Sequence, residues 1–267
     1  MRKVRGKLMI RSVLTIKGGV GKTTTAMNLA AGFAQQGKKT LLIDLDGQSN
    51  CTSIVLGQDY IEDGLTITEA LRGNKTLQEC IHETNVKNLY IIPSDIELFV
   101  VEKDLLLSAT MGIQQTKLKK LLRSIKKDYD EIIIDNGRAL DLLATNSLCA
   151  CDELIIPCDM ERSALQGVKI VLDHCRAILE NIDGVEFDYK ILITKVNRTK
   201  ADAINIEKIK QLYGNHVYET QIRYQAKPVK EAGMESHMLI DDKKAKVAQD
   251  YRNLIEEVSS GAICPKQ

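Results

Sequence analysis

The sequence KGGVGKTT, residues 17–24, decides the fold of this chain of 267 residues. It follows the apolar run 13–16, which is typical of a buried strand. It leads into residues 23–36, where apolar side chains recur at helical spacing and Gly37 provides a stop. This order of strand, glycine-rich loop and helix is the local plan of a phosphate-binding site in an α/β protein.

The residues of this loop have the chemistry that phosphate binding requires. Glycines let successive backbone N–H groups point at one anion, and the new helix adds the positive end of its dipole. Lys22 can reach the outer phosphates, and the Thr23 hydroxyl can bind Mg²⁺. The strict pattern G-x-x-x-x-G-K-[ST] is not met, because Ile16 stands at its first glycine and an extra lysine, Lys17, follows. The predicted nucleotide-binding residues of the loop are Lys17, Gly18, Gly19, Val20, Gly21, Lys22, Thr23 and Thr24.

This loop resembles the deviant Walker A motif of the ParA/MinD family of P-loop ATPases. The resemblance implies ATP and Mg²⁺ as ligands, and a homodimer that closes around the bound ATP. In that family the extra lysine reaches the phosphates of the partner subunit. The resemblance therefore makes Lys17 the lysine that acts across the dimer, and it places Lys17 and Lys22 among the catalytic residues.

A second segment, residues 41–50 with the sequence LLIDLDGQSN, ends a predicted buried strand in two carboxylates. It resembles the family's second motif, usually LLIDLDPQxN, with Gly47 in place of the proline. The resemblance makes Asp46 the catalytic residue that orients the attacking water. A carboxylate at a strand end can accept a proton from that water or hold the water in line. Asp44 is expected to support the neighbouring loops or the metal ion.

Residues 132–135, Ile-Ile-Ile-Asp, resemble a Walker B strand, which makes Asp135 a ligand of Mg²⁺ through water. The family usually continues with Thr-Pro-Pro or Cys-Pro-Pro, whereas this chain has Asn136-Gly137-Arg138. Proline restricts the backbone, so its absence predicts a looser loop. Arg138 is then a contact of phosphate, a contact of a partner subunit, or a solvated loop residue.

Weaker matches extend the resemblance over roughly residues 11–258. They lie at 92–102, 152–167 and 230–251. Residues 194–198 fall where relatives place a loop that contacts adenine. Asn197 is accordingly a candidate for reading the base, with an ordinary turn asparagine as the alternative.

Strands that alternate with helices predict a single α/β domain, with a mostly parallel, twisted sheet of about seven strands and helices on both faces. Ligands in such folds bind at the carboxyl ends of the strands. We expect a basic N-terminal tail at 1–10, the ATPase domain at 11–258 and a C-terminal tail at 259–267. The predicted strands are 13–16, 40–46, 89–93, 131–135, 154–157, 189–194 and 217–222, and the predicted helices are 23–36, 66–71, 77–81, 98–106, 116–127, 163–181, 203–213 and 242–258.

The composition excludes several other classes of protein. With 44% apolar and 27% charged residues, the chain is typical of a globular protein, and no apolar run approaches the roughly 18–20 residues of a membrane span. A signal peptide is not expected, because Arg11 interrupts the apolar segment after the basic N-terminus. Seven cysteines at irregular spacings fit a reducing, cytoplasmic compartment, and Cys149 and Cys151 are expected to be core residues.

DNA binding has to come from a local patch, because the net charge of the whole chain is only +1. Residues 195–252 contain twelve basic and eight acidic side chains, a local excess of four positive charges. The family often carries an arginine after its seventh strand, where this chain has Ile222-Arg223-Tyr224. A solvated charged face is the alternative. The candidate DNA contacts are Arg223, Lys227, Lys230, Arg198 and Lys200.

We expect a cytoplasmic, nucleoid-associated ParA-like ATPase that partitions DNA. The resemblance implies that its ATP-bound homodimer binds double-stranded DNA without sequence preference, and that a ParB-like protein triggers release. The first alternative is a MinD-like membrane cycler, which needs a C-terminal amphipathic helix with a free apolar face. The apolar face of residues 243–258 is instead expected to pack on the domain. The remaining alternatives are an electron-transfer ATPase with cluster-binding cysteines, and a nucleotide-gated binding module with little turnover.

Overall fold

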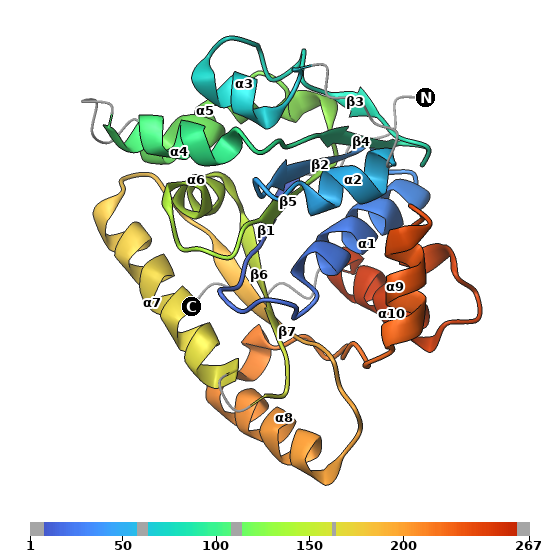
Figure 1. Ribbon diagram of the computed structural model, residues 1–267. Helices are drawn as coiled ribbons and strands as arrows, with labels where there is room; N and C mark the ends of the chain where they lie inside the picture. The colour runs from blue at the N-terminus through green and yellow to red at the C-terminus, as the bar shows by residue number, and fades with distance from the viewer. Residues whose placement is uncertain (1–7, 58–63, 108–113, 162–163, 261–267) are drawn as a thin grey trace.

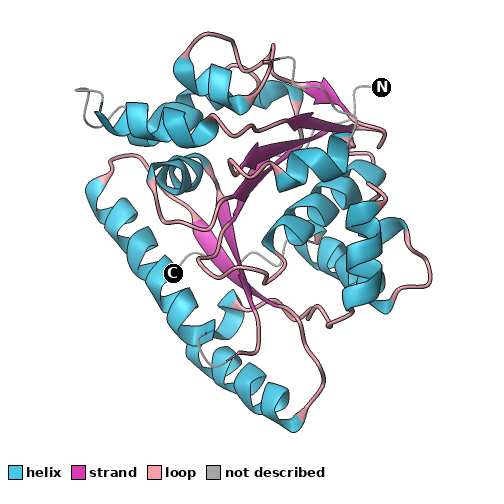
Figure 2. Ribbon diagram, viewed as in Figure 1, coloured by secondary structure: helices cyan, strands magenta, loops and turns pink. Residues whose placement is uncertain are grey.

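A computed structural model describes residues 8–57, 64–107, 114–161 and 164–260. Within these ranges a central seven-stranded sheet lies between two layers of helices, as Figure 1 and Figure 2 show. The strands are β1 (Met9–Val13), β2 (Thr40–Leu45), β3 (His82–Glu83), β4 (Leu89–Ile92), β5 (Glu131–Asn136), β6 (Glu153–Cys158) and β7 (Asp188–Ile193). The helices are α1 (Lys22–Gln35), α2 (Asn50–Leu56), α3 (Ile67–Arg72), α4 (Leu98–Leu107), α5 (Lys117–Leu122), α6 (Leu142–Ala150), α7 (Ala164–Asn181), α8 (Lys200–Tyr213), α9 (Ala226–Met234) and α10 (Lys246–Ser259).

The order of the strands brings the functional segments to one edge of the sheet. The order is β3-β4-β2-β5-β1-β6-β7, and only β3 and β4 pair in antiparallel fashion. Val13 at the end of β1 lies beside Asp135 of β5, and Asp44 of β2 lies beside Asp135 on its other side. The predicted α/β fold with a mostly parallel sheet and helices on both faces is confirmed.

Side chains of the central strands alternate between two hydrophobic cores, as expected for strands that are covered on both faces. In β5, Ile133 enters one core, whereas Ile132 and Ile134 enter the other. The first core is covered by α1, α2, α9 and α10, and the second by α3 to α8 (Figure 1). The sheet is thereby held rigid, and its carboxyl edge remains open for a ligand.

Helix α10 packs on α1 through its apolar face. Val247, Leu254, Ile255 and Val258 are all buried there. Ile255 comes so close that a Cβ on Gly32 would lie 2.0 Å from its Cδ1 atom. The prediction that this apolar face packs on the domain is confirmed.

The segments that form the two edge regions of the sheet differ from the predicted strands. Residues 217–222 run along β7, but their one bridge to it is the isolated pair Val217 and Ile191, so they are not a strand. The seventh strand is instead β3, which has only two residues. The first strand also lies earlier than predicted, at Met9–Val13, and the chain leaves the sheet before the glycine loop.

Several helices also differ from the prediction. Residues 77–81 form turns rather than a helix, and the helix predicted at 116–127 is divided into α5 and the 3₁₀ turn Lys126–Asp128. Helices α2, α6 and α9 were not predicted. Most of the predicted tails, 1–10 and 259–267, lies outside the described residues, so these boundaries remain predictions.

Candidate nucleotide-binding site

A pocket of about 510 Å³ opens at the carboxyl edge of the sheet, in front of the N-terminus of α1. Ligand pockets commonly enclose about 300–1,000 Å³, so this one can hold a nucleotide. Its walls are formed by residues 17–24, Asp46, Arg138, residues 194–195 and residues 222–226, with contributions from α9 and α10. All eight residues of the predicted phosphate loop line it.

The phosphate loop has the backbone shape that anion binding needs. Gly19 and Gly21 have φ angles of 74° and 89°, which favour glycine because a Cβ there is strained. Val20 is buried, and its carbonyl oxygen accepts a hydrogen bond of 2.9 Å from the Thr194 hydroxyl, which holds the loop against β7. Helix α1 begins at Lys22, so its free N–H groups and the positive end of its dipole face the pocket.

Lys22 extends from the first turn of α1 to the end of β5. Its Nζ atom lies 3.2 Å from Asp135 Oδ1 and also donates to the carbonyl oxygen of Asn136. The side chain is 7% exposed and still reaches the pocket wall. Lys22 is thus held ready at the base of the pocket, where its ammonium can move from Asp135 to an incoming phosphate.

Asp135 has the features of a group that takes a ligand. It is almost completely buried, and its Oδ2 atom has no hydrogen-bond partner within the described part of the chain. Burial raises its pKa, whereas Lys22 and a hydrogen bond from the Thr23 side chain lower it. Mg²⁺ in nucleotide sites is commonly held by one or two protein oxygens together with the phosphates. Thr23 and Asp135 fit that requirement because both present oxygen atoms beside Lys22.

Asp44 has a different environment, although it lies beside Asp135 in the sheet. It accepts hydrogen bonds from the Thr52 backbone N–H (2.9 Å), the Thr52 hydroxyl (2.7 Å) and the Asp46 N–H (3.1 Å). Burial and the neighbouring Asp135 raise the pKa of Asp44 to about 7. Of its two predicted roles, these contacts favour support of the loops, because both carboxylate oxygens already have partners.

Asp46 lies in the pocket wall just beyond β2. One of its oxygens accepts a hydrogen bond of 3.0 Å from the Gln48 N–H, which orients the carboxylate. Gly47 follows at the position where relatives have proline. A Cβ on Gly47 would lie 2.7 Å from the Phe99 ring, so this departure from the motif is matched by an aromatic contact from α4.

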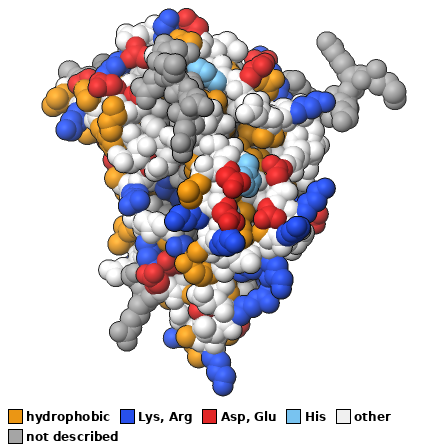
Figure 3. All heavy atoms as spheres, turned by 45° about the vertical axis from the view of Figure 1, so that its right-hand side comes forward, with side chains coloured by type: hydrophobic (Ala, Val, Ile, Leu, Met, Phe, Trp, Pro, Cys, Tyr) orange, Lys and Arg blue, Asp and Glu red, His pale blue; other side chains and the backbone are white. Residues whose placement is uncertain are grey.

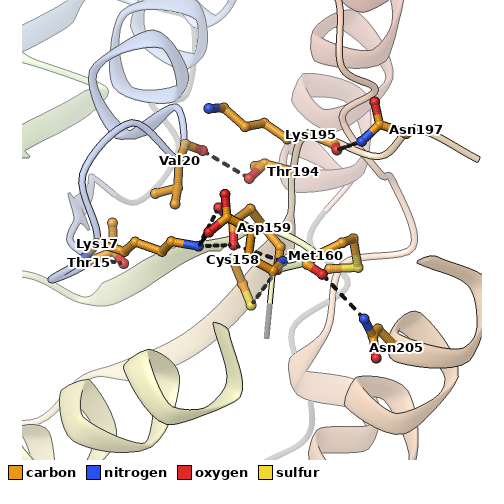
Figure 4. A network of polar contacts seen from close by, with 11 residues as sticks. Thr15, Lys17, Val20, Cys158, Asp159, Met160, Thr194, Lys195, Asn197 and Asn205 are labelled. Atoms are coloured by element: carbon orange, nitrogen blue, oxygen red, sulfur yellow. Dashed lines mark hydrogen bonds and ion pairs between the residues drawn. The ribbon is translucent and has the colours of Figure 1, made fainter. Parts of the chain in front are cut away.

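Lys17 points across the loop to the end of β6, as Figure 4 shows. Its Nζ atom lies 2.7 Å from Asp159 Oδ1 and 2.6 Å from Glu161 Oε2. Burial by itself lowers the pKa of Lys17, but the hydrogen bonds to these two carboxylates hold it above the usual value. Within one subunit this lysine is therefore neutralised by its own chain, and its side chain remains 24% exposed at the pocket rim.

Asn197 does not line the pocket among the residues described here. Its side-chain amide donates to the Lys195 carbonyl oxygen at 3.3 Å, as Figure 4 shows, and its backbone N–H donates to Asp202. Lys195 lines the wall instead, and its ammonium lies 5.8 Å from the centre of the Tyr224 ring. The base-reading role of Asn197 stays a prediction.

The candidate DNA contacts have unequal surroundings. Arg223 is held by Asp250 through bonds of 2.6 and 2.5 Å and lines the nucleotide pocket, which Lys230 also lines. Lys227 is 84% exposed with Glu231 at 3.7 Å, and Arg198 and Lys200 are both exposed. On the face shown in Figure 3, Lys and Arg side chains gather in the lower half. Lys227, Arg198 and Lys200 are thus more exposed than Arg223, and the role of all these residues in DNA binding stays a prediction.

The six cysteines within the described ranges are core residues. Cys51, Cys80, Cys149, Cys151, Cys158 and Cys175 are all free and buried. Burial raises the pKa of Cys149 to about 11. Within the described residues, no group of His, Cys, Asp and Glu side chains is arranged to hold a metal ion by itself. The core role predicted for Cys149 and Cys151 is confirmed.

Some pocket residues were missed by the motif analysis. Lys195, Tyr224 and Tyr251 line the wall, and Arg138 was left with three alternatives. Arg138 stands directly after the Walker B strand, which was a usable signal. Tyr251 reaches the pocket from α10, where its hydroxyl lies 3.2 Å from that of Thr25, and its place at the end of the matched segment 230–251 was a usable signal.

The fold and the site together define a P-loop nucleotide-binding protein. The central strand leads through a glycine-rich loop into a helix, and a lysine, a threonine and an aspartate lie at the base of a nucleotide-sized pocket. A family model described as an AAA domain matches residues 9–187. The chain belongs to the ParA/Soj family, as the resemblance of its motifs predicted.

Individual relatives cover nearly the whole chain. The sporulation initiation inhibitor protein Soj of Bacillus subtilis is 32% identical over 96% of this chain and 99% of its own length. The chromosome-partitioning ATPase Soj of Treponema pallidum is 33% identical over 91% of this chain and 93% of its own length. Among solved structures, cobyrinic acid a,c-diamide synthase from Mycobacterium smegmatis with a bound ATP analogue and magnesium has a TM-score of 0.79. It is 25% identical, and the match covers 96% of this chain and 95% of that one.

Proposed function

We propose that this protein is a Mg²⁺-dependent ATPase that partitions DNA. The observation that carries the proposal is that Lys22, Thr23 and Asp46 line one pocket of nucleotide size, while the buried Asp135 lies 3.2 Å from the Lys22 Nζ atom. Lys22 binds the outer phosphates of ATP, and Asp46 holds the attacking water or accepts its proton. Thr23 and Asp135 hold Mg²⁺, which neutralises charge on the phosphates when it is bound. The names of the relatives and the ATP analogue in the solved structure support this assignment.

The proposed cycle depends on a homodimer that forms when ATP is bound. Lys17 leaves Asp159 and Glu161 and reaches the nucleotide of the partner subunit. The support for this step is that Lys17 is partly exposed at the pocket rim and that, among the residues the structure describes, its ammonium is bound only by two side chains that follow β6. A buried lysine with partners on several elements could not make this exchange without unfolding part of the site.

The ATP-bound dimer binds double-stranded DNA without sequence preference. Arg198, Lys200 and Lys227 supply exposed positive charge, and Arg223 and Lys230 stand nearer the nucleotide. Neutralisation of phosphates by such side chains predicts an affinity that falls steeply with salt. A ParB-like partner then stimulates a slow hydrolysis, which releases the DNA and leaves the protein associated with the nucleoid only part of the time.

A membrane-cycling function has less support. The apolar face of α10 is buried against α1, so it does not offer a surface to lipid. No helix within the described ranges is long and apolar enough to cross a membrane. A nucleotide-gated binding module would differ from the proposed ATPase only in its rate of ATP hydrolysis, so a measurement of that rate separates the two functions.

The first test measures binding to non-specific duplex DNA and to anionic vesicles without nucleotide, with ADP and with ATP. It compares the wild type with Lys17→Ala and, as a matched control, Lys87→Ala, which removes an exposed lysine in the turn before β4. We expect DNA binding that requires ATP, falls with salt, is lost in Lys17→Ala and is kept in Lys87→Ala. Binding to vesicles instead of DNA would establish the membrane function. Binding to neither surface would overturn the DNA-partition proposal.

A further inference from the structure

The loop that follows β5 is anchored through Asn136, the last residue of that strand. The side-chain amide of Asn136 donates to the Ser12 hydroxyl and to the Val13 carbonyl oxygen, both at 2.9 Å. The carbonyl oxygen of Asn136 accepts a hydrogen bond from Lys22. Asn136 stands where the family usually has Thr or Cys, so these bonds fix the residue before the two missing prolines, and the looser loop predicted at residues 137–138 stays a prediction. The anchor sets the direction in which the next two residues leave the sheet.

Gly137 and Arg138 then pass between Asp46 and the phosphate loop. The Cβ position of Gly137 lies 3.8 Å from Asp46 Oδ1. The Arg138 guanidinium lies over Gly18, where a Cβ would stand 3.0 Å from Nη1, 3.2 Å from Cζ and 3.5 Å from Nε. A side chain at position 18 would therefore press on the guanidinium, and glycine leaves it this place without a shift. Arg138 thus lies at the end of the pocket where Lys22 and Asp46 act, which is the end for the outer phosphates.

The Arg138 side chain makes no hydrogen bond or ion pair with the part of the chain that the structure describes. Arg223, which lines the same pocket, is held by two bonds from Asp250. Lys17 is likewise held by Asp159 and Glu161, and its side chain is directed toward Asp159 (Figure 4). Of these three cations, Arg138 alone lies over the loop with its hydrogen-bond donors free.

We propose that Arg138 is a phosphate-binding residue that the chain supplies to its own nucleotide, and that it distinguishes ATP from ADP. The planar guanidinium donates two parallel N–H bonds to oxygens of the terminal phosphate, a geometry that suits arginine better than lysine. The bound γ-phosphate thereby fixes residues 136–138 beside Asp46. The inference rests on the proposed function, because it assumes that ATP binds in this pocket.

The test compares the affinities for ADP and for a slowly hydrolysed ATP analogue, both with Mg²⁺, by isothermal titration calorimetry. The variants are Arg138→Ala, Arg138→Lys and the matched control Arg123→Ala, which removes an exposed arginine at the end of α5. We expect Arg138→Ala to lower the affinity for the ATP analogue about tenfold or more, because hydrogen bonds between charged groups are strong. The affinity for ADP should change much less. Arg138→Lys should recover part of the difference, and Arg123→Ala should change neither affinity.

A second arm separates action within one chain from action across the dimer. The same titrations are made in a Lys17→Ala background at low protein concentration, where the proposed dimer does not form. Persistence of the Arg138→Ala effect supports a contact within the chain, and its disappearance overturns the proposal. An unchanged ratio of ATP-analogue to ADP affinity in Arg138→Ala also overturns it, although the proposed function stands. If the wild type binds neither nucleotide, the proposed function itself is wrong.

Discussion

The central strands carry buried charges at both ends, and the two ends differ in how these charges are paired. Toward the amino end, Arg11 of β1 contacts Glu131 of β5 and lies 2.7 Å from Glu153 of β6. Lys38 adds a second cation 2.7 Å from Glu131. At the carboxyl end, Lys22 faces Asp135 while Asp44 lies beside them, and an oxygen of Asp135 has no partner in the described chain.

The difference separates a structural cluster from a binding site. Charges that the chain itself pairs fully do not need a ligand. Removal of one partner leaves the other charges buried and unpaired, which costs a large part of the free energy of unfolding. Charges with free oxygen atoms keep part of their hydrogen-bonding capacity for a ligand. The carboxyl end therefore gives up stability in the free protein and recovers it when Mg²⁺ and nucleotide bind.

The largest effect on stability is expected for Arg11→Met at the paired end. Glu131 and Glu153 would lose their shared cation inside the sheet, so we expect the free energy of unfolding to fall by about 3–5 kcal/mol. Urea denaturation measures this change, and nucleotide affinity measured at low temperature should remain that of the wild type. A folded Arg11→Met protein with normal stability and impaired nucleotide binding would contradict the division between the two ends.

A change of opposite sign is expected for Asp135→Asn at the open end. The neutral amide removes a buried charge whose pKa is raised by burial, so the protein without nucleotide should become about 1–2 kcal/mol more stable. The rise in melting temperature that ATP and Mg²⁺ give the wild type should be largely lost. If Asp135→Asn instead destabilises the free protein as strongly as Arg11→Met, the two ends are equally structural.

The smallest effect is expected for Lys38→Met. Its side chain is 32% exposed, and Arg11 still faces Glu131 after the substitution. We expect a loss below about 1 kcal/mol, as for other partly exposed ion pairs. The urea midpoint provides the measurement, and comparison with Arg11→Met removes the contribution of simply changing the net charge. A loss of several kcal/mol would mean that Lys38, rather than Arg11, is the main counter-charge.

Local sequence predicted the elements whose pattern is periodic or whose chemistry is distinctive. The phosphate loop, β2, α7 and Asp135, the residue before the last of β5, were all predicted close to their observed places. Helix α6 was missed because it is buried all round, so its sequence has no polar face and no amphipathic period. Strand β3 has two residues, which is too few for an alternating pattern.

The segment 217–222 shows the limit of strand propensity. Its composition favours a strand, and Tyr218 and Ile222 do donate to carbonyl oxygens of β7. The segment nevertheless forms no continuous ladder with β7. Val217 bridges to Ile191 of β7, and the next bridge joins Arg223 to Val196, beyond the end of that strand. Whether an extended segment forms a ladder depends on its partner strand, which the segment itself does not encode.

The sequence by itself determined the phosphate loop, because its glycines, its lysine and the start of its helix act within a few consecutive residues. It also determined the carboxylates that end β2 and β5. Only the tertiary structure decided which side chains lie next to the residues of this loop and next to these carboxylates. Lys17 meets Asp159, Arg138 lies over Gly18, and Asp44 lies beside Asp135. These contacts join positions some 90–140 residues apart, and they exist because the order and register of parallel strands bring their carboxyl ends to one edge.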